Sequence, residues 1–286
     1  MSAIIVLQQR NAIHMAVDGA SYTQDGILRS VVQKCFALPT LPMLVAGMGL
    51  AGVTAAAADE IAQRFATFDD AVAGLEAFMP EFVSDHEGHL FSSDSTQNHF
   101  TVYFVGLSAK RGLEAYAMFY CDPDHRDYWR SKANGVTSKE PFVLERVAGC
   151  TLSPPVTGRE MSAAGIPCQG SSEAEILERF TDVDLLHVME IQRRDKGGPL
   201  LPGMDSKFWV GGHCQISTLT GDGTITQRTV HRWPDKIGEP ITPETPDWQQ
   251  WRTRVAASGA REHSPAPLQL TRQQRRALER EQRKSA

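Results

Sequence analysis

Cysteine is scarce in this chain of 286 residues, and the five cysteines lie far apart with no CxxC pair among them. An odd number at scattered positions argues against a disulfide framework and against a zinc or redox motif. We therefore expect reduced cysteines that are mostly buried as small apolar side chains. The sequence gives no sign of a bound metal ion.

Long apolar stretches are also missing. No run approaches the roughly 18 to 20 residues that a membrane-spanning helix needs, and the first residues lack the pattern of a signal peptide. We expect a cytoplasmic protein with no membrane partner, whose hydrophobic residues, 41% of the total, fill a real core. The formal net charge of −5 combines an acidic body with a basic end at residues 271–286, which argues against nucleic-acid binding by the body.

The apolar pattern predicts separate groups of strands and helices. Short β-branched runs predict strands, whereas a repeat from Leu50 to Phe65 and a capping signal at Asp69 predict two helices. Ser172 followed by Glu175 predicts the start of a further helical block, in one or two pieces. The predicted strands are residues 3–7, 12–18, 27–32, 33–38, 41–46, 100–107, 113–121, 208–219 and 224–230.

This order indicates an α+β protein. Segregated strands and helices favour two antiparallel sheets packed face to face with helices outside, and not alternating parallel βα units. Prolines crowd the chain from residue 233 onward, before the basic end. We expect one domain at residues 2–232 and a largely disordered tail at residues 233–286.

The second residue is a candidate nucleophile. Ser2 follows the initiator Met1, and cytosolic aminopeptidases remove methionine when the next side chain is small. The mature chain would then carry a hydroxyl beside a free amine, which titrates near pH ~7.7 to 8.0 and suits a general base. Lys34 would add positive potential beside the hydroxyl, and Asp18 would hold its ammonium group.

The spacing of Ser2, Asp18 and Lys34, without gaps and with Ala16-Val17-Asp18 in the opening hairpin, resembles the catalytic β subunits of the proteasome and their bacterial relatives. These are N-terminal nucleophile hydrolases. The resemblance implies a four-layer αββα sandwich and hydrolysis of amide bonds through an acyl-enzyme. In that family the nucleophile is normally threonine, whose methyl branch restricts χ1. The hydroxyl of a serine is therefore less restricted in its orientation.

Two further positions follow from the resemblance. The stretch at residues 42–47 looks like the family's strand leading to a glycine that donates to the oxyanion, which makes Gly47 the candidate donor. Arg194-Asp195 followed by Gly197-Gly198 resembles a turn that bears a supporting aspartate, which is Asp195 here. Residues 148–151 offer no clear equivalent of the family's other supporting serine.

The resemblance also implies partners. It predicts a peptide or unfolded-protein substrate, a homo-oligomer such as a dimer or ring, and an unfolding partner if the protein is a compartmentalised protease; it implies no metal or organic cofactor. Two alternatives stay open: a small-molecule amidase with the same site residues, and an inactive assembly or structural subunit that keeps Met1. His86 and His89 are interpreted as residues of a solvated loop, and Asp122 to His125 as a turn at the exit of a strand, rather than as metal ligands.

Overall fold

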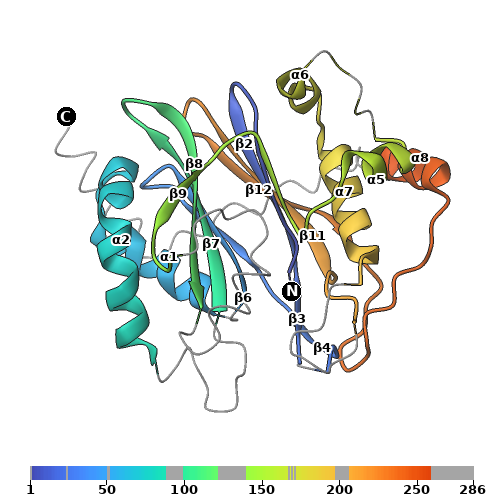
Figure 1. Ribbon diagram of the computed structural model, residues 1–286, viewed down its shortest axis with the longest axis horizontal. Helices are drawn as coiled ribbons and strands as arrows, with labels where there is room; N and C mark the ends of the chain where they lie inside the picture. Colours follow the sequence, from blue (N-terminus) through green and yellow to red (C-terminus); the bar gives the residue numbers. More distant parts are fainter. Residues whose placement is uncertain are drawn as a thin grey trace.

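The strands of the computed structural model form three antiparallel sheets. The structure describes residues 2–23, 25–49, 52–87, 99–121, 140–166, 168, 170, 172–196 and 206–258. The first sheet has the order β10-β1-β2-β11-β12 and the second the order β5-β6-β7-β8-β9, while β3 and β4 pair alone. Figure 1 shows the two five-stranded sheets side by side, with β3 and β4 at the lower end of the first sheet.

Each sheet draws on distant parts of the chain. The strands of the first sheet are β1 (Ile4–Gln8), β2 (Ala12–Asp18), β10 (Cys150–Ser153), β11 (His213–Thr220) and β12 (Ile225–Arg232). Those of the second are β5 (Cys35–Leu38), β6 (Met43–Gly49), β7 (His99–Ser108), β8 (Gly112–Cys121) and β9 (Leu144–Val147). The small sheet joins β3 (Ala20–Tyr22) to β4 (Leu28–Val31).

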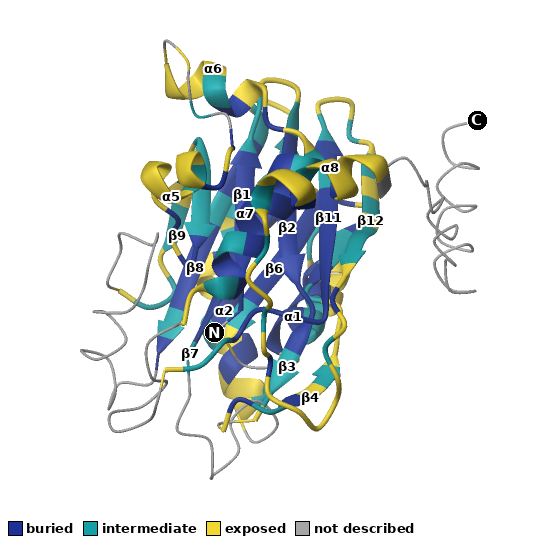
Figure 2. Cartoon of the chain, turned by 90° about the vertical axis from the view of Figure 1, so that its right-hand side faces the viewer, coloured by how far each residue is buried: buried dark blue, intermediate teal, exposed yellow. Residues whose placement is uncertain are grey.

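Helices cover the outer faces of both large sheets. The second sheet carries α1 (Val53–Arg64) and α2 (Phe68–Asp85), and Figure 1 shows both on its outer side. The first sheet carries α7 (Asp182–Arg194) and α8 (Trp248–Ser258), which lie in front of its strands in Figure 2. Two short helices, α5 (Gly158–Ala163) and α6 (Glu173–Glu178), lie beside them. No helix in the described ranges combines the length and apolarity needed to cross a membrane.

Alternation along β1 explains how one strand serves two cores. Ile4 and Val6 belong to the core between the large sheets, whereas Ile5 and Leu7 belong to the core beneath α7. A strand buried on both faces has no polar positions, which is why residues 3–7 form a continuous apolar run. Ser2 lies two residues before this strand and is itself buried.

The prediction of a four-layer αββα sandwich of two sheets is wrong. The described residues contain three antiparallel sheets and six helices, and α5 and α6 have only six residues each, so the outer covering is not a regular layer. The third sheet arises because residues 20–22, which lie outside the predicted strands, pair with β4. Strands β9 and β10 lie in a region whose irregular polar sequence hides their short apolar segments.

The segment after β12 packs onto the first sheet, although the sequence assigns it to a tail. Trp233, Trp251 and Val255 belong to the core cluster beneath α7. On α7, His187 stacks against the rings of Trp248 and Trp251 at 4.6 and 4.7 Å between centroids. Tryptophans spread over a proline-rich sequence carry no helical or strand period, which is why this packing escapes prediction. Residues 259–286 lie outside the described residues.

Candidate functional site

Three predicted site residues converge at the entrance to β1. The Lys34 Nζ atom donates a hydrogen bond to Ser2 Oγ at 2.8 Å and another to Asp18 Oδ1 at 2.8 Å. The Lys34 side chain is 11% exposed and that of Asp18 is fully buried. The Ser2 residue is 6% exposed. A hydroxyl, an ammonium group and a carboxylate thus form one small, largely dry cluster.

Asp18 is the best-anchored member of the cluster. Besides Lys34, its Oδ1 atom accepts a hydrogen bond from the backbone N–H of Ala3 at 2.9 Å. Its Oδ2 atom accepts from the backbone N–H groups of Ala20 and Gly211 at 3.0 and 3.2 Å. A buried carboxylate is tolerable when its lone pairs are filled in this way, so these donors hold the charge in place and fix its direction.

The secondary structure explains why these residues meet. β1 and β2 pair in register with Ile4 opposite Val17, which places Ser2 and Asp18 at the same end of the hairpin. Lys34 directly precedes β5 of the facing sheet. The cluster therefore lies where one end of the β1–β2 hairpin meets the start of β5 in the facing sheet.

Burial sets the electrostatics of the cluster. Desolvation lowers the pKa of Lys34 below its usual value, while the charge and hydrogen bond of Asp18 oppose this shift. His213, the first residue of β11, also has a lowered pKa because of burial, with Asp18 raising it and Arg232 and Lys34 lowering it. The lysine thus holds its proton less firmly than a solvated lysine, and the imidazole is biased towards its neutral form.

Gly47 lies on β6 beside Lys34, but its N–H is engaged. The Gly47 N–H donates to the Lys34 carbonyl at 3.2 Å, at the long end of the range for such bonds. A side chain at this position is excluded, since a Cβ would lie 2.0 Å from Thr54 Oγ1 of α1. The glycine therefore permits close packing of α1 on β6, whatever further role its N–H has.

Asp195 does not join the cluster in the described part of the chain. It follows α7, is exposed, and its backbone N–H donates to Gln192 at 3.2 Å. Burial and the charge of Glu160 raise the pKa of its carboxyl group. Gly197 and Gly198, the rest of the predicted turn, lie outside the described residues. The glycine pair that reaches the cluster is instead Gly211-Gly212, directly before β11.

Sequence reasoning missed this second pair and the residues that hold it. Gly211 donates to Asp18, and Gly212 donates to Asp235 Oδ2 at 2.8 Å. Asp235 in turn pairs with Arg193 of α7. Two adjacent glycines after the apolar residues 208–210 were the available signal, because strand interiors disfavour glycine and the pair indicates a close backbone approach.

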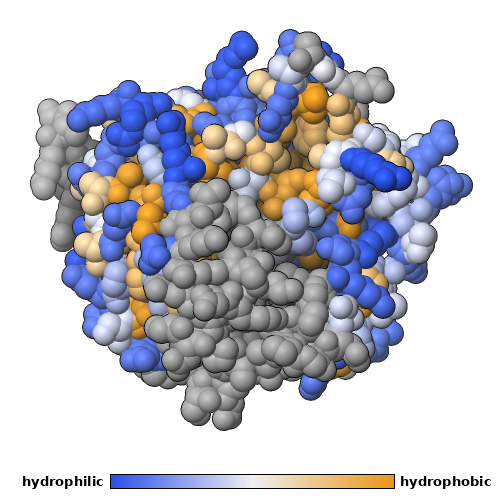
Figure 3. All heavy atoms as spheres, in the orientation of Figure 1, coloured by the Kyte–Doolittle hydropathy of each residue, from blue (hydrophilic) through white to orange (hydrophobic). Residues whose placement is uncertain are grey.

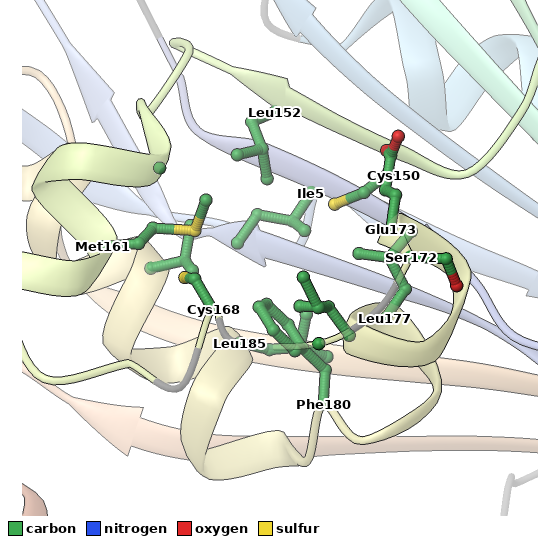
Figure 4. A pocket seen from close by; sticks show the side chains of 14 residues that line it. Ile5, Cys150, Leu152, Met161, Cys168, Ser172, Glu173, Leu177, Phe180 and Leu185 are labelled. Atoms are coloured by element: carbon green, nitrogen blue, oxygen red, sulfur yellow. The ribbon is translucent and has the colours of Figure 1, made fainter.

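A separate cavity lies on the other face of β1. It has a volume of about 540 Å³, and apolar side chains from β1, β10 and the helices line it, among them Ile5, Leu152, Met161 and Phe180. Figure 4 shows Cys150 and Cys168 pointing towards it, and Figure 3 shows hydrophobic residues gathered near α6. Burial raises the pKa of the Cys150 thiol to about 12, so this cysteine stays protonated and inert at neutral pH.

Acidic, histidine and cysteine side chains do not gather into a metal site in the described ranges, where no group of three or more is placed to hold an ion. Of the two histidines in the predicted loop motif, His86 caps α2 and contacts Glu60 at 3.0 Å, while His89 lies outside the described residues. Asp122 and His125 lie outside them as well. The Ser2, Asp18 and Lys34 cluster is thus the candidate site.

Comparison with known proteins supplies a fold relation. Neither protein-family models nor curated proteins gave a match. Among solved structures, the chain is similar to Anbu (ancestral beta-subunit) from Yersinia bercovieri, with a TM-score of 0.51 and 10% identity over 89% of this chain and 93% of that chain. It is also similar to the Anbu complex from Pseudomonas aeruginosa, described as a helical assembly, with a TM-score of 0.50 and 12% identity over 89% and 92%.

These neighbours correct the family suggested by the sequence. Anbu proteins are proteasome-like but form a distinct family, so the assignment to proteasome β subunits and their bacterial homologues is wrong. The short spacing that carried the resemblance covers only the first strands, and it does not separate one such family from another. Identities of 10 and 12% show the fold alone.

Proposed function

We propose that this chain hydrolyses amide bonds with Ser2 as an N-terminal nucleophile, after Met1 has been removed. The observation that carries the proposal is the contact of Lys34 Nζ with both Ser2 Oγ and Asp18 Oδ1 in a buried cluster. A lysine is costly to bury, and a serine hydroxyl that accepts its hydrogen bond is polarised towards the alkoxide. The substrate class that we propose is a peptide or an unfolded protein.

The free amine of Ser2 is the proposed general base. It takes the hydroxyl proton as Oγ attacks the substrate carbonyl, and it returns the proton to the departing nitrogen. Water then attacks the ester on Ser2 and releases the acid. Lys34 stabilises negative charge on Oγ, and its positive charge keeps the neighbouring amine deprotonated by like-charge repulsion.

Asp18 and the two resemblance-derived positions have supporting roles in this proposal. Asp18 aims the Lys34 ammonium and balances its charge. Gly47 is the proposed donor to the oxyanion, which requires its N–H to exchange the long bond to the Lys34 carbonyl for the substrate oxygen. Asp195 remains a supporting residue predicted from the resemblance alone, and the effect of its substitution on turnover would test this role.

The fold relation supports an assembled state. The Anbu complex from Pseudomonas aeruginosa is described as a helical assembly. We propose by this likeness that copies of this chain also associate into a homo-oligomer. An unfolding partner would follow if the assembly encloses its active sites.

The decisive experiment labels the nucleophile. Intact mass of the purified protein should lack Met1, and a hydroxyl-directed β-lactone or epoxyketone should add one equivalent at Ser2. Ser2→Ala permits the same methionine removal and keeps the amine, but it removes the hydroxyl, so labelling and turnover should both be lost. Ser2→Thr should keep both, because the hydroxyl remains.

A matched control is Ser30→Ala on β4, which removes a serine hydroxyl outside the cluster and should leave labelling unchanged. Retention of Met1, or turnover that survives Ser2→Ala, would overturn the proposal. A panel that pairs unfolded-protein substrates with small amides then separates a peptidase from an amidase, because only the substrate preference distinguishes them.

A further inference from the structure

A buried ion pair lies behind the candidate site. Arg193, in the last turn of α7, and Asp235, just after β12, are 3% and 5% exposed. Their two contacts are parallel, with Nη2 to Oδ1 at 2.5 Å and Nη1 to Oδ2 at 2.9 Å. Burying both charges carries a large desolvation cost, which the pair and its further hydrogen bonds must offset. The partners of those further bonds show which part of the chain the pair holds in place.

Those further bonds all go to the chain segment before β11. Arg193 Nη1 donates to the Val210 carbonyl at 2.7 Å, and the Gly212 N–H donates to Asp235 Oδ2 at 2.8 Å. The guanidinium also lies 4.9 Å from the ring centroid of Trp233, and the backbone N–H of Trp233 donates to the Gly212 carbonyl at 3.0 Å. The ion pair therefore holds residues 210–212 from one side.

The glycines in this segment make the contact possible. A Cβ at Gly211 would lie 2.6 Å from Asp235 Oδ2 and 2.8 Å from Arg193 Nη1. Gly212 has a φ of +74°, which an L side chain rarely adopts. A side chain at Gly211 would therefore push the ion pair off the backbone, whereas one at Gly212 would strain the backbone and crowd Val31.

The other side of the same segment holds the candidate site. The Gly211 N–H donates to Asp18 Oδ2 at 3.2 Å, and the Gly211 carbonyl accepts from the Gly19 N–H at 3.0 Å. The opposite oxygen of Asp18 accepts the hydrogen bond from Lys34. Residues 210–212 thus contact the Arg193–Asp235 pair on one side and the Asp18 carboxylate on the other.

We propose that Arg193 and Asp235 are positioning residues, which fix Gly211 and through it the direction of the Asp18 carboxylate and the Lys34 ammonium on Ser2. This inference rests on the proposed function of Ser2. Asp235, which lies in the segment expected to be a tail, would thus help to fix the geometry of the site. A small displacement of Gly211 would let the Asp18 carboxylate rotate and move the ammonium away from the hydroxyl.

The test uses the full chain with Asp235→Asn, which keeps a carbonyl oxygen for the Gly212 N–H and removes the charge that binds Arg193. One readout is amide hydrogen exchange in a peptide covering residues 206–215, which should speed up at Gly211. The other is the rate of β-lactone acylation of Ser2 across pH. We expect about a 100-fold slower acylation with a shifted pH profile, since misplacement of about 1 Å costs that much.

The control variant is Glu81→Gln, which breaks an exposed ion pair with Arg64 and should change neither readout. Should Asp235→Asn fail to fold, Arg193→Lys keeps the charge but loses the forked pair of donors, and it should give the same two changes. Exchange and acylation that match the wild type in a folded variant would overturn the inference. If the wild type is not acylated, the proposed function fails, and the exchange readout still decides whether the ion pair controls Gly211.

Discussion

At the scale of single residues, Lys34 shows how burial sets reactivity. Its ammonium has two acceptors and little water, so its pKa falls because of desolvation although Asp18 favours the charge. The same two hydrogen bonds hold it on the Ser2 hydroxyl. A solvated lysine would have neither this direction nor this reduced hold on its proton.

His187 offers a residue-scale prediction about pH. Burial lowers its pKa from 6.5 to about 4, with Arg252 and Arg194 lowering it further and Asp184 raising it. Between these values the unfolded chain binds more protons than the folded one, so the free energy of unfolding falls as pH drops through this window. His187→Asn, which keeps an acceptor for Arg252, should lose less stability over the same window.

Urea unfolding of both proteins at about pH 7, 5.5 and 4.5 measures this difference. The wild type should lose stability faster than the variant on acidification. Equal slopes would show that His187 carries its proton just as readily in the folded state as in the unfolded chain.

Residues near the start of the chain carry a local signal in the sequence. Ser2 and Asp18 lie at one end of the first hairpin, whose pairing fixes their separation locally, whereas Lys34 reaches them from the start of β5 in the facing sheet. The donors to Asp18 from Ala20 and Gly211 are backbone groups, which leave no side-chain signature in the sequence. Asp195 was chosen by its neighbouring glycines, but a glycine pair alone does not say which part of the chain it approaches.

At the scale of elements, α2 shows how packing decides a boundary. Its N-cap is Thr67, whose side chain accepts from the Asp70 N–H at 3.1 Å, although Asp69 has an equally suitable side chain. Phe68 decides between them because its ring lies over Gly106, where a Cβ would lie 2.1 Å away. The prediction of Asp69 as the cap is therefore wrong, because the packing of Phe68 on the facing strand begins the helix two residues earlier.

Thr67→Ala tests this cap. We expect a loss of about 1 kcal/mol in the free energy of unfolding, because the Asp70 N–H loses its acceptor. Thr67→Ser should stay close to the wild type. Urea midpoints at constant slope measure both, and an alanine variant as stable as the wild type would show that water replaces the threonine oxygen at no cost.

At the scale of the whole molecule, the segment after β12 is part of the folded body. A chain that ends at residue 232 loses three side chains from the core beneath α7, namely Trp233, Trp251 and Val255. We expect it to lose more stability than the roughly 3 to 5 kcal/mol of one Trp→Ala change in a core. A matched chain that ends at Ser258 keeps every described contact, and its thermal midpoint should stay near that of the full chain.

Prediction from sequence is weakest at this largest scale. Separated groups of strands and helices were predictable from apolar periods, but the number of sheets and the order of strands in each were not. The third sheet, the packing of α8 and the Arg193–Asp235 pair depend on contacts between distant segments. Such contacts are set by shape and burial in three dimensions, for which a single sequence has no local period.

The hydrogen bond between Asp18 and Gly211 spans 193 positions of the chain. During synthesis, the proposed nucleophile Ser2 therefore emerges among the first residues, whereas Gly211, which anchors the Asp18 carboxylate, emerges only after most of the polypeptide. While synthesis is under way, Ser2 has no complete set of neighbours. On the proposed role of Ser2, a nascent chain on the ribosome would thus lack an assembled site for hydrolysis.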